Sequence, residues 1–124
     1  MAALTEPNNL GDLLKYEEDN RFSRDIVTVA SGRSLKIGEV VSIKTADGKA
    51  YALAPAAADG TEVAVGVLLQ DANATSSDLE AVMAARDSIV YSGAIVWPVG
   101  ITTNQKATAT AQLKALGVLI REGA

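Results

Sequence analysis

Residues 24–44 read RDIVTVASGRSLKIGEVVSIK and contain two β-prone runs joined by a short turn. The first run, residues 26–29, is IVTV, and its β-branched side chains favour an extended backbone. The second run, residues 35–44, places Val41 and Ile43 on one face of a strand, and a glycine within it is expected to introduce a kink. The stretch therefore predicts a sheet, and it contains no catalytic pattern.

Further strands follow from turn signals and alternating patterns. The dipeptide Asp47-Gly48 is a hairpin signal between two β-prone runs. Residues 61–70 carry apolar or small residues on both faces, which indicates a strand buried on two sides. Between the later strands, residues 71–78 (DANATSSD) are expected to form a polar loop. The strands predicted after this loop are residues 79–85, residues 88–91 and a final short one over residues 118–121.

One helix is predicted, over residues 102–116. Thr102 is expected to be its N-cap, with Gln105 reaching back to complete a capping box. The apolar side chains expected to share one helical face are those of Ala109, Leu113 and Leu116. The fold class is thus mainly β, with one main α-helix near the C-terminus, in a single domain over residues 24–124.

The first 23 residues differ from this domain in pattern. Pro7, Asn8, Asn9 and Gly11 lie in the first half of this segment, which shows little periodicity, as is typical of an exposed terminal segment. We expect residues 1–23 to form an extended, flexible N-terminal arm.

Composition excludes whole classes of chemistry. The chain has 124 residues, with no cysteine and no histidine. Disulfide scaffolds, thiol catalysis, and triads or metal sites that depend on histidine are therefore impossible within it. We expect no enzymatic activity, no cofactor and no metal.

Charge and hydropathy argue against two classes of partner. The net charge is −4 and the basic residues are scattered, so the sequence predicts no nucleic-acid binding. The start, MAALTEPNNL, lacks the pattern of a signal peptide, and no apolar run approaches the about 20 residues of a membrane span.

Two alternative functions remain open at this stage. A histidine-free enzyme would need carboxylates that converge in a pocket, and the candidates are Asp59, Glu62, Asp78 and Glu80. A carrier or accessory binding module would present Lys49, which follows the predicted hairpin turn, as lipoyl and biotinyl domains present their lysine. Solvated carboxylates in loops and an ordinary turn lysine are the simpler interpretations of the same residues.

An ordered series of fragments resembles a known family. The fragments are Ser23-Arg24, VTVASG at residues 27–32, LKIGEV at 35–40, DGT at 59–61, AVGVL at 64–68, VWP at 96–98, ALGV at 115–118 and Arg121. Together they span residues 23–122, and they resemble the head decoration proteins of tailed phages, the lambda-type capsid-stabilising family.

This resemblance implies a fold and a function. The expected fold is a β-clip-like small domain. The expected function is that of a non-enzymatic structural protein, which binds as a homotrimer at three-fold positions of the expanded head and stabilises it against the pressure of packaged DNA. Its partners would be the major capsid protein and further copies of itself. Its place would be the outer capsid surface of the virion, after synthesis in the host bacterial cytoplasm.

The N-terminal arm and the first strand are the expected capsid-binding elements, because an extended segment can add to an exposed sheet edge. The candidate contact residues are Leu13, Leu14, Tyr16, Ile26, Val27, Thr28 and Val29. Pairing of residues 26–29 within their own domain is the alternative. The Trp97-Pro98 pair is expected to be a core anchor or an interface anchor.

Overall fold

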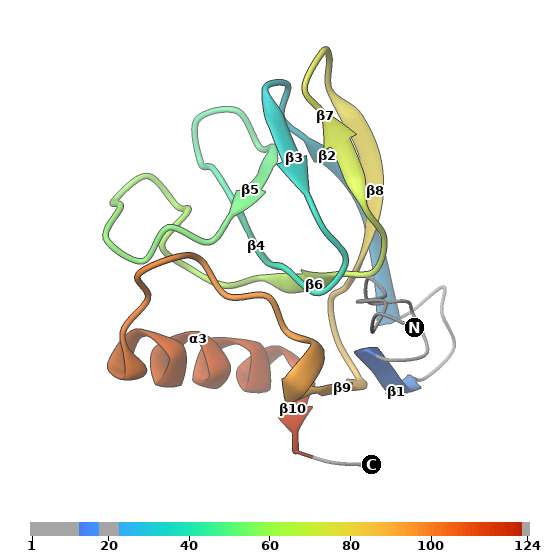
Figure 1. Ribbon diagram of the computed structural model, residues 1–124, viewed down its shortest axis with the longest axis vertical. Coiled ribbons are helices and arrows are strands. Elements are labelled where there is room, and N and C mark those ends of the chain that lie inside the picture. The colour runs from blue at the N-terminus through green and yellow to red at the C-terminus, as the bar shows by residue number, and fades with distance from the viewer. Residues whose placement is uncertain (1–12, 18–22, 123–124) are drawn as a thin grey trace, which may run out of the picture.

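Five short strands form a closed barrel in the computed structural model, which describes residues 13–17 and 23–122 of the chain (Figure 1). In barrel order these strands are β2 (Arg24–Val29), β5 (Ala50–Ala52), β4 (Val40–Ile43), β6 (Gly66–Leu68) and β8 (Leu79–Ala84). The β4–β5 pair is the hairpin predicted at Asp47-Gly48, and it is antiparallel. Gly48 has a φ of 67°, which a glycine adopts without steric cost.

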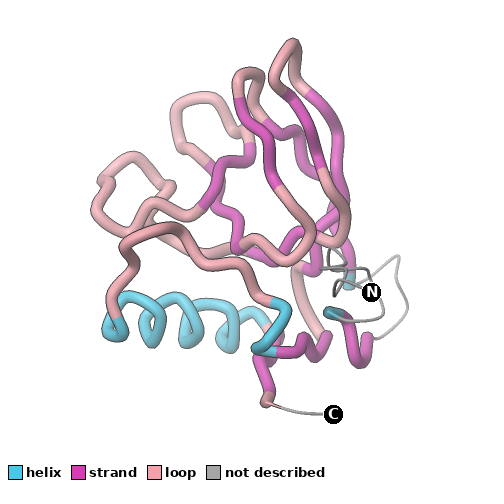
Figure 2. The backbone as a smooth tube through the Cα atoms, in the orientation of Figure 1, coloured by secondary structure: helices cyan, strands magenta, loops and turns pink. Residues whose placement is uncertain are grey.

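Two smaller sheets and a helix complete the fold. β1 (Leu14–Glu17), β9 (Ser88–Tyr91) and β10 (Val118–Arg121) form a three-stranded sheet, and β3 (Arg33–Leu35) pairs with β7 (Ala72–Ala74). A 3-10 turn, η1 (Ser92–Ala94), leads toward α3 (Thr103–Leu116). α3 and the three-stranded sheet lie together at one end of the barrel, and loops connect most of the short strands (Figures 1 and 2).

The buried residues divide into two clusters on either side of the barrel wall. The barrel core is built from Val29, Leu35, Val41, Ala50, Leu68, Ala72, Ala74, Ala81, Met83 and Ala85. The interlayer core joins the barrel to α3 and the three-stranded sheet, and its residues include Leu13, Val40, Val67, Ala84, Val90, Ala109, Leu113 and Val118. Small and medium side chains dominate both clusters, as a chain with 4% aromatic residues requires.

β4 shows how a strand serves both clusters. Successive side chains of a strand point to opposite faces, so Val40 packs in the interlayer core and Val41 in the barrel core. Ser42, the next residue of β4, is fully buried, and its hydroxyl donates to the backbone carbonyl of Tyr51 at 3.2 Å. The pattern expected for this strand, with Val41 and Ile43 on one face, is confirmed.

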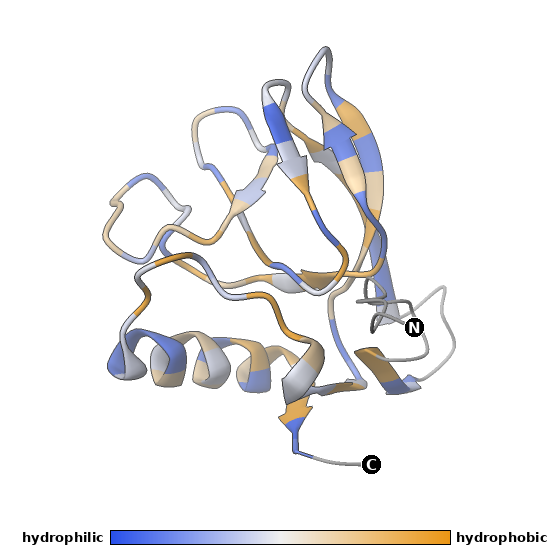
Figure 3. Ribbon diagram, in the orientation of Figure 1, coloured by the Kyte–Doolittle hydropathy of each residue, from blue (hydrophilic) through white to orange (hydrophobic). Residues whose placement is uncertain are grey.

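The helix begins and ends as its sequence predicts. The Thr102 hydroxyl accepts from the backbone N–H of Gln105, and the Gln105 side chain accepts from the backbone N–H of Thr102, which completes the capping box. Gly117 ends the helix with a left-handed φ of 91°. Figure 3 shows polar and apolar colours mixed along α3, consistent with a helix that buries only one side.

The mainly β fold with one main helix near the C-terminus is confirmed. Three local predictions are wrong. The loop over residues 71–78 contains β7, because β3 offers its residues a backbone partner. The strand over residues 61–70 is limited to Gly66–Leu68. Leu116 is 44% exposed, because Ala109 and Leu113 alone reach the interlayer core.

Part of the predicted N-terminal arm belongs to the domain. Leu14–Glu17 forms β1, which pairs with β9 in antiparallel fashion, and Leu13 is fully buried in the interlayer core. Residues 1–12 and 18–22 lie outside the described residues, so an arm over residues 1–12 stays a prediction.

The two leucines of α3 provide a test of this packing. Leu113→Ala is expected to lower the free energy of unfolding by about 2–5 kcal/mol, because it leaves a cavity in the interlayer core. Leu116→Ala is the matched control, and a change below about 1 kcal/mol is expected since its side chain is largely in water. Urea denaturation followed by circular dichroism measures both. Equal losses for the two variants would contradict the helical face described above.

Candidate functional site

The carboxylates that a catalytic site would need are used to stabilise turns. The Asp59 carboxylate accepts from the backbone N–H of Thr61 at 3.1 Å and also from its hydroxyl, which lowers the Asp59 pKa. The Asp47 carboxylate accepts from the hydroxyl of Tyr51 at 2.7 Å and from the backbone N–H of Lys49 at 2.9 Å, and its pKa is lowered as well. These groups are held ionised, whereas a general acid at neutral pH requires a raised pKa.

The other predicted enzyme candidates are also spread apart. The Glu62 carboxylate accepts from the backbone N–H of Gly60 at 2.8 Å. Asp78 and Glu80 lie at the start of β8, exposed to solvent. Within residues 13–17 and 23–122, no group of three or more acidic residues is placed to hold a metal ion. The four candidate carboxylates therefore form no such group in this part of the chain.

Lys49, the candidate attachment site of the carrier alternative, has a structural partner. Its Nζ lies 2.7 Å from Asp78 Oδ2, and this contact raises the pKa of Lys49 and lowers that of Asp78. Asp78 also accepts from the backbone N–H of Ser31 at 2.8 Å. The pair thus ties the β4–β5 hairpin to the turn after β2 and the start of β8. A ligand-bearing lysine would be expected to project freely, and Lys49 does not.

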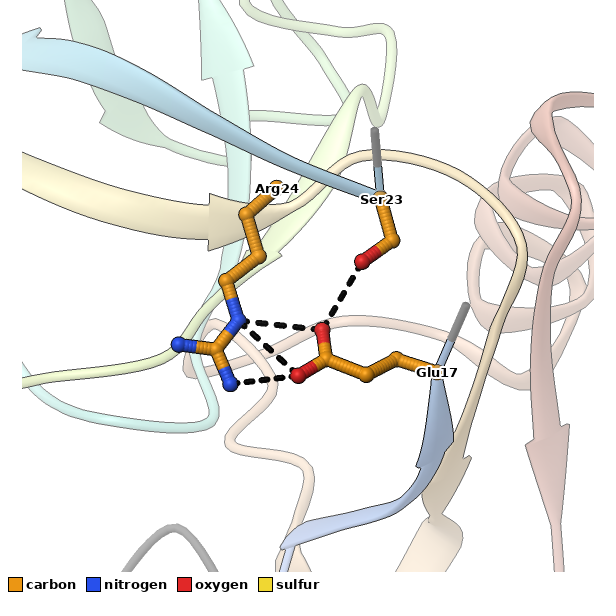
Figure 4. Close-up of polar contacts among 3 residues, drawn as sticks. All are labelled: Glu17, Ser23 and Arg24. Carbon is orange, nitrogen blue, oxygen red and sulfur yellow. Dashed lines mark hydrogen bonds and ion pairs between the residues drawn. The ribbon is translucent and has the colours of Figure 1, made fainter. Parts of the chain in front are cut away.

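A polar cluster connects β1 to the start of β2 (Figure 4). The Nε of Arg24 donates to both carboxylate oxygens of Glu17, at 3.1 and 3.0 Å, and its Nη2 also contacts Oε1. The Ser23 hydroxyl donates to Glu17 Oε2 at 2.8 Å. The hydrogen bonds from Arg24 lower the pKa of Glu17 and raise that of Arg24. The cluster joins the three-stranded sheet to the barrel at the base of β2.

β2 is fully paired on one edge and nearly open on the other. It pairs with β8 along its whole length, from Arg24↔Ala84 to Val29↔Leu79. On its other side it meets β5 only at Val29↔Ala50. The second edge over residues 24–28 has no strand partner among the described residues. Along one of its two edges, the segment 26–29 therefore pairs within its own domain, as the alternative prediction stated.

The predicted contact residues fall into two groups. Tyr16 is 51% exposed and Ile26 is 69% exposed, so both present apolar surface to solvent. Leu13 and Val29 are fully buried, and their side chains cannot reach a partner while the cores stay closed. The remaining three, which are partly buried, are Leu14, Val27 and Thr28.

The predicted anchor pair lies beside an exposed apolar residue. Trp97 is partly buried and packs against the interlayer core, which fits its interpretation as a core anchor. Val99 is fully exposed two residues later, and Val96 is 38% exposed. The sequence analysis did not single out Val99. Its place between Pro98 and Gly100, in a segment with no polar residue from 94 to 101, could have indicated an exposed apolar loop.

One comparison with known proteins identifies a family. The family model of bacteriophage lambda head decoration protein D matches residues 3–118 of the chain. No curated protein matches this chain. The matched residues include both cores, β1 and β2, and all of α3.

The cluster of Glu17 predicts how stability changes with pH. Because the folded-state pKa of Glu17 lies below its ordinary value of 4.5, its contribution is complete above that value and is lost as the pH falls through the folded-state pKa. Glu17→Gln should lower the free energy of unfolding by about 1 kcal/mol at pH 7. The difference from the parent protein should shrink as the pH is lowered from 5 toward 2.5.

Urea denaturation across this pH range measures the effect, with Glu80→Gln at an exposed position as the control. A difference between the Glu17 variant and its parent that persists unchanged at low pH would show that the ion pair is not its source.

Proposed function

The chain belongs to the family of bacteriophage lambda head decoration protein D, and from this membership we propose that it binds the outer surface of a phage head as a homotrimer and stabilises the shell. The family match over residues 3–118 carries the proposal. Proteins of this family are structural, and a head decoration protein has its place in the virion capsid. The absence of cysteine and histidine agrees with a role that depends on binding alone.

The second edge of β2 is the surface that we assign to the capsid protein. Residues 24–28 have no strand partner on this edge among the described residues, and Ile26 presents an apolar side chain beside them. Adding a strand to such an edge supplies affinity through backbone hydrogen bonds and specificity through alternate side chains. Of the predicted contact residues, we retain Tyr16 and Ile26 as those whose side chains meet the partner directly.

Assembly into a trimer would raise the overall affinity of the β2 edges for the shell. A cyclic trimer uses one contact between unlike surfaces, repeated three times until it closes. Once one β2 edge has docked, the other two bind at a high effective concentration, so a modest single contact yields tight attachment. The trimer would then join neighbouring capsid subunits and resist their separation by packaged DNA.

Stabilisation of the shell follows from binding to the assembled state. A ligand present at about 100 times its dissociation constant stabilises the state that it binds by about 2.7 kcal/mol per site. A head offers many equivalent sites, so this gain is repeated over the shell. No covalent chemistry is needed.

Ile26→Asp tests the β2 edge. The substitution places a charge where an apolar side chain would contact the shell, and binding to purified expanded shells should weaken by about 10-fold or more. Val63→Asp is the matched control, because Val63 is also exposed, at 40%, and lies outside β2. Co-sedimentation with shells measures both. Unchanged binding of the Ile26 variant would exclude this edge as the contact.

Sedimentation of the isolated protein tests the trimer and the arm. The full-length chain should sediment as a trimer of 12.8 kDa subunits and should occupy shells at about one trimer per three-fold site. Deletion of residues 1–12 leaves β1 in place, so it separates the arm from the folded domain. We expect weaker shell binding with an unchanged unfolding midpoint. No binding of the full-length protein to any shell would overturn the proposed function.

A further inference from the structure

Among the described residues, no strand pairs with the outer edge of β10, which lies beside the C-terminal half of α3. β10 is the outermost strand in the order β1-β9-β10, and it pairs with β9 in parallel. A groove of about 200 Å³ lies along it, which we call the β10 groove. Its lining residues are Thr110 and Lys114 of α3, with Leu119, Ile120 and Arg121 of β10. Figure 1 shows β10 next to the last turn of α3.

The β10 groove reaches the backbone of the strand. Successive side chains of a strand point to opposite faces, so a groove lined by three consecutive residues runs along the edge. The N–H of Ser88 donates to the carbonyl of Gly117 at 3.1 Å, which sets the phase of the parallel ladder. In that phase Leu119 directs its N–H and C=O toward β9, and Ile120 directs both of its groups outward. The groove therefore offers one backbone donor and one acceptor to a new strand.

Both charged residues of the β10 groove are cations. Lys114 and Arg121 are exposed, and neither forms an ion pair with another described residue. The described residues that line the groove include no carboxylate, although the chain carries a net charge of −4. Leu119 and Ile120 are partly buried and contribute apolar surface between the two charges. The surface is thus complementary to an extended segment that carries negative charge.

We propose that the β10 groove binds an extended acidic segment of a partner protein, which adds as a strand to β10 and places carboxylates against Lys114 and Arg121. Backbone pairing with Ile120 would set the direction of the segment, and the two cations would select its charge. The site is separate from the β2 edge, and the proposal stands whether or not the protein binds phage shells.

A pair of designed peptides tests the proposal with the full-length chain. The probes are a hexapeptide of alternating Val and Glu and one of alternating Val and Lys, each titrated into isotope-labelled protein. The acidic peptide should shift the Ile120 amide resonance and slow its hydrogen exchange, and the basic peptide should do neither. Binding should weaken as salt is raised, since exposed ion pairs are screened.

Charge reversal distinguishes peptide binding at the β10 groove from non-specific electrostatic attraction to the protein. Lys114→Glu with Arg121→Glu should weaken binding of the acidic peptide by about 10-fold and allow the basic peptide to bind, because two favourable ion pairs are lost and repulsion replaces them. The matched control, Arg33→Glu with Lys36→Glu, changes the net charge equally at exposed residues outside the groove. It should leave acidic-peptide binding within about 2-fold of the parent. Lys114→Gln with Arg121→Gln is the second variant, should charge reversal disturb folding.

Four results would overturn the proposal. The acidic peptide could fail to bind, or it could bind without changing the Ile120 amide. It could also bind equally well to the charge-reversed variant and its control. Finally, a change of oligomeric state in the Lys114/Arg121 variants by sedimentation would show that a second copy of this chain occupies the groove. Shell binding is measured separately, so failure here leaves the proposed function untouched.

Discussion

The antiparallel pairing of β2 with β8 decides which residues of the N-terminal half face the core and which face solvent. In this register Val27 and Val29 turn into the barrel and Ile26 turns outward. A slip of one residue would exchange the two faces and bury the polar set, so the barrel core holds the register in place. The same pairing brings Arg24 to the point where it meets Glu17, and thereby joins the three-stranded sheet to the barrel.

The barrel wall is shared between two cores built from small side chains. Each side chain buries little area, so stability depends on the continuity of packing across β4, β6 and β8 rather than on a few large residues. Leu13 and Leu113 extend that continuity from the barrel to β1 and α3. β2, over residues 24–28, and β10 each keep a sheet edge without a strand partner among the described residues. Such an edge can pair with other chains and cause aggregation unless a partner covers it or charged side chains lie beside it. The apolar Ile26 beside one edge and the cations beside the other suit these edges to different partners.

The polar side chains of this protein serve its architecture. Asp47 and Asp59 accept hydrogen bonds within turns, and Asp78 accepts from the backbone N–H of Ser31 and pairs with Lys49. These contacts lower the pKa values of the three carboxyl groups. These carboxylates stabilise the fold, and the chain contains no histidine or cysteine. This matches a family whose members decorate a shell.

The sequence by itself determined the elements whose causes are local. The β-branched run at 26–29, the Asp47-Gly48 turn and the capping box at Thr102 each depend on residues a few positions apart, and all three are present in the structure. It also carried the ordered fragments that revealed the family. Only the tertiary structure decided that Leu13 and Val29 are buried, that Leu116 is exposed, and that a polar loop contains β7. Burial and strand pairing depend on segments far apart along the chain, and local patterns carry no information about which distant segment will cover a given face.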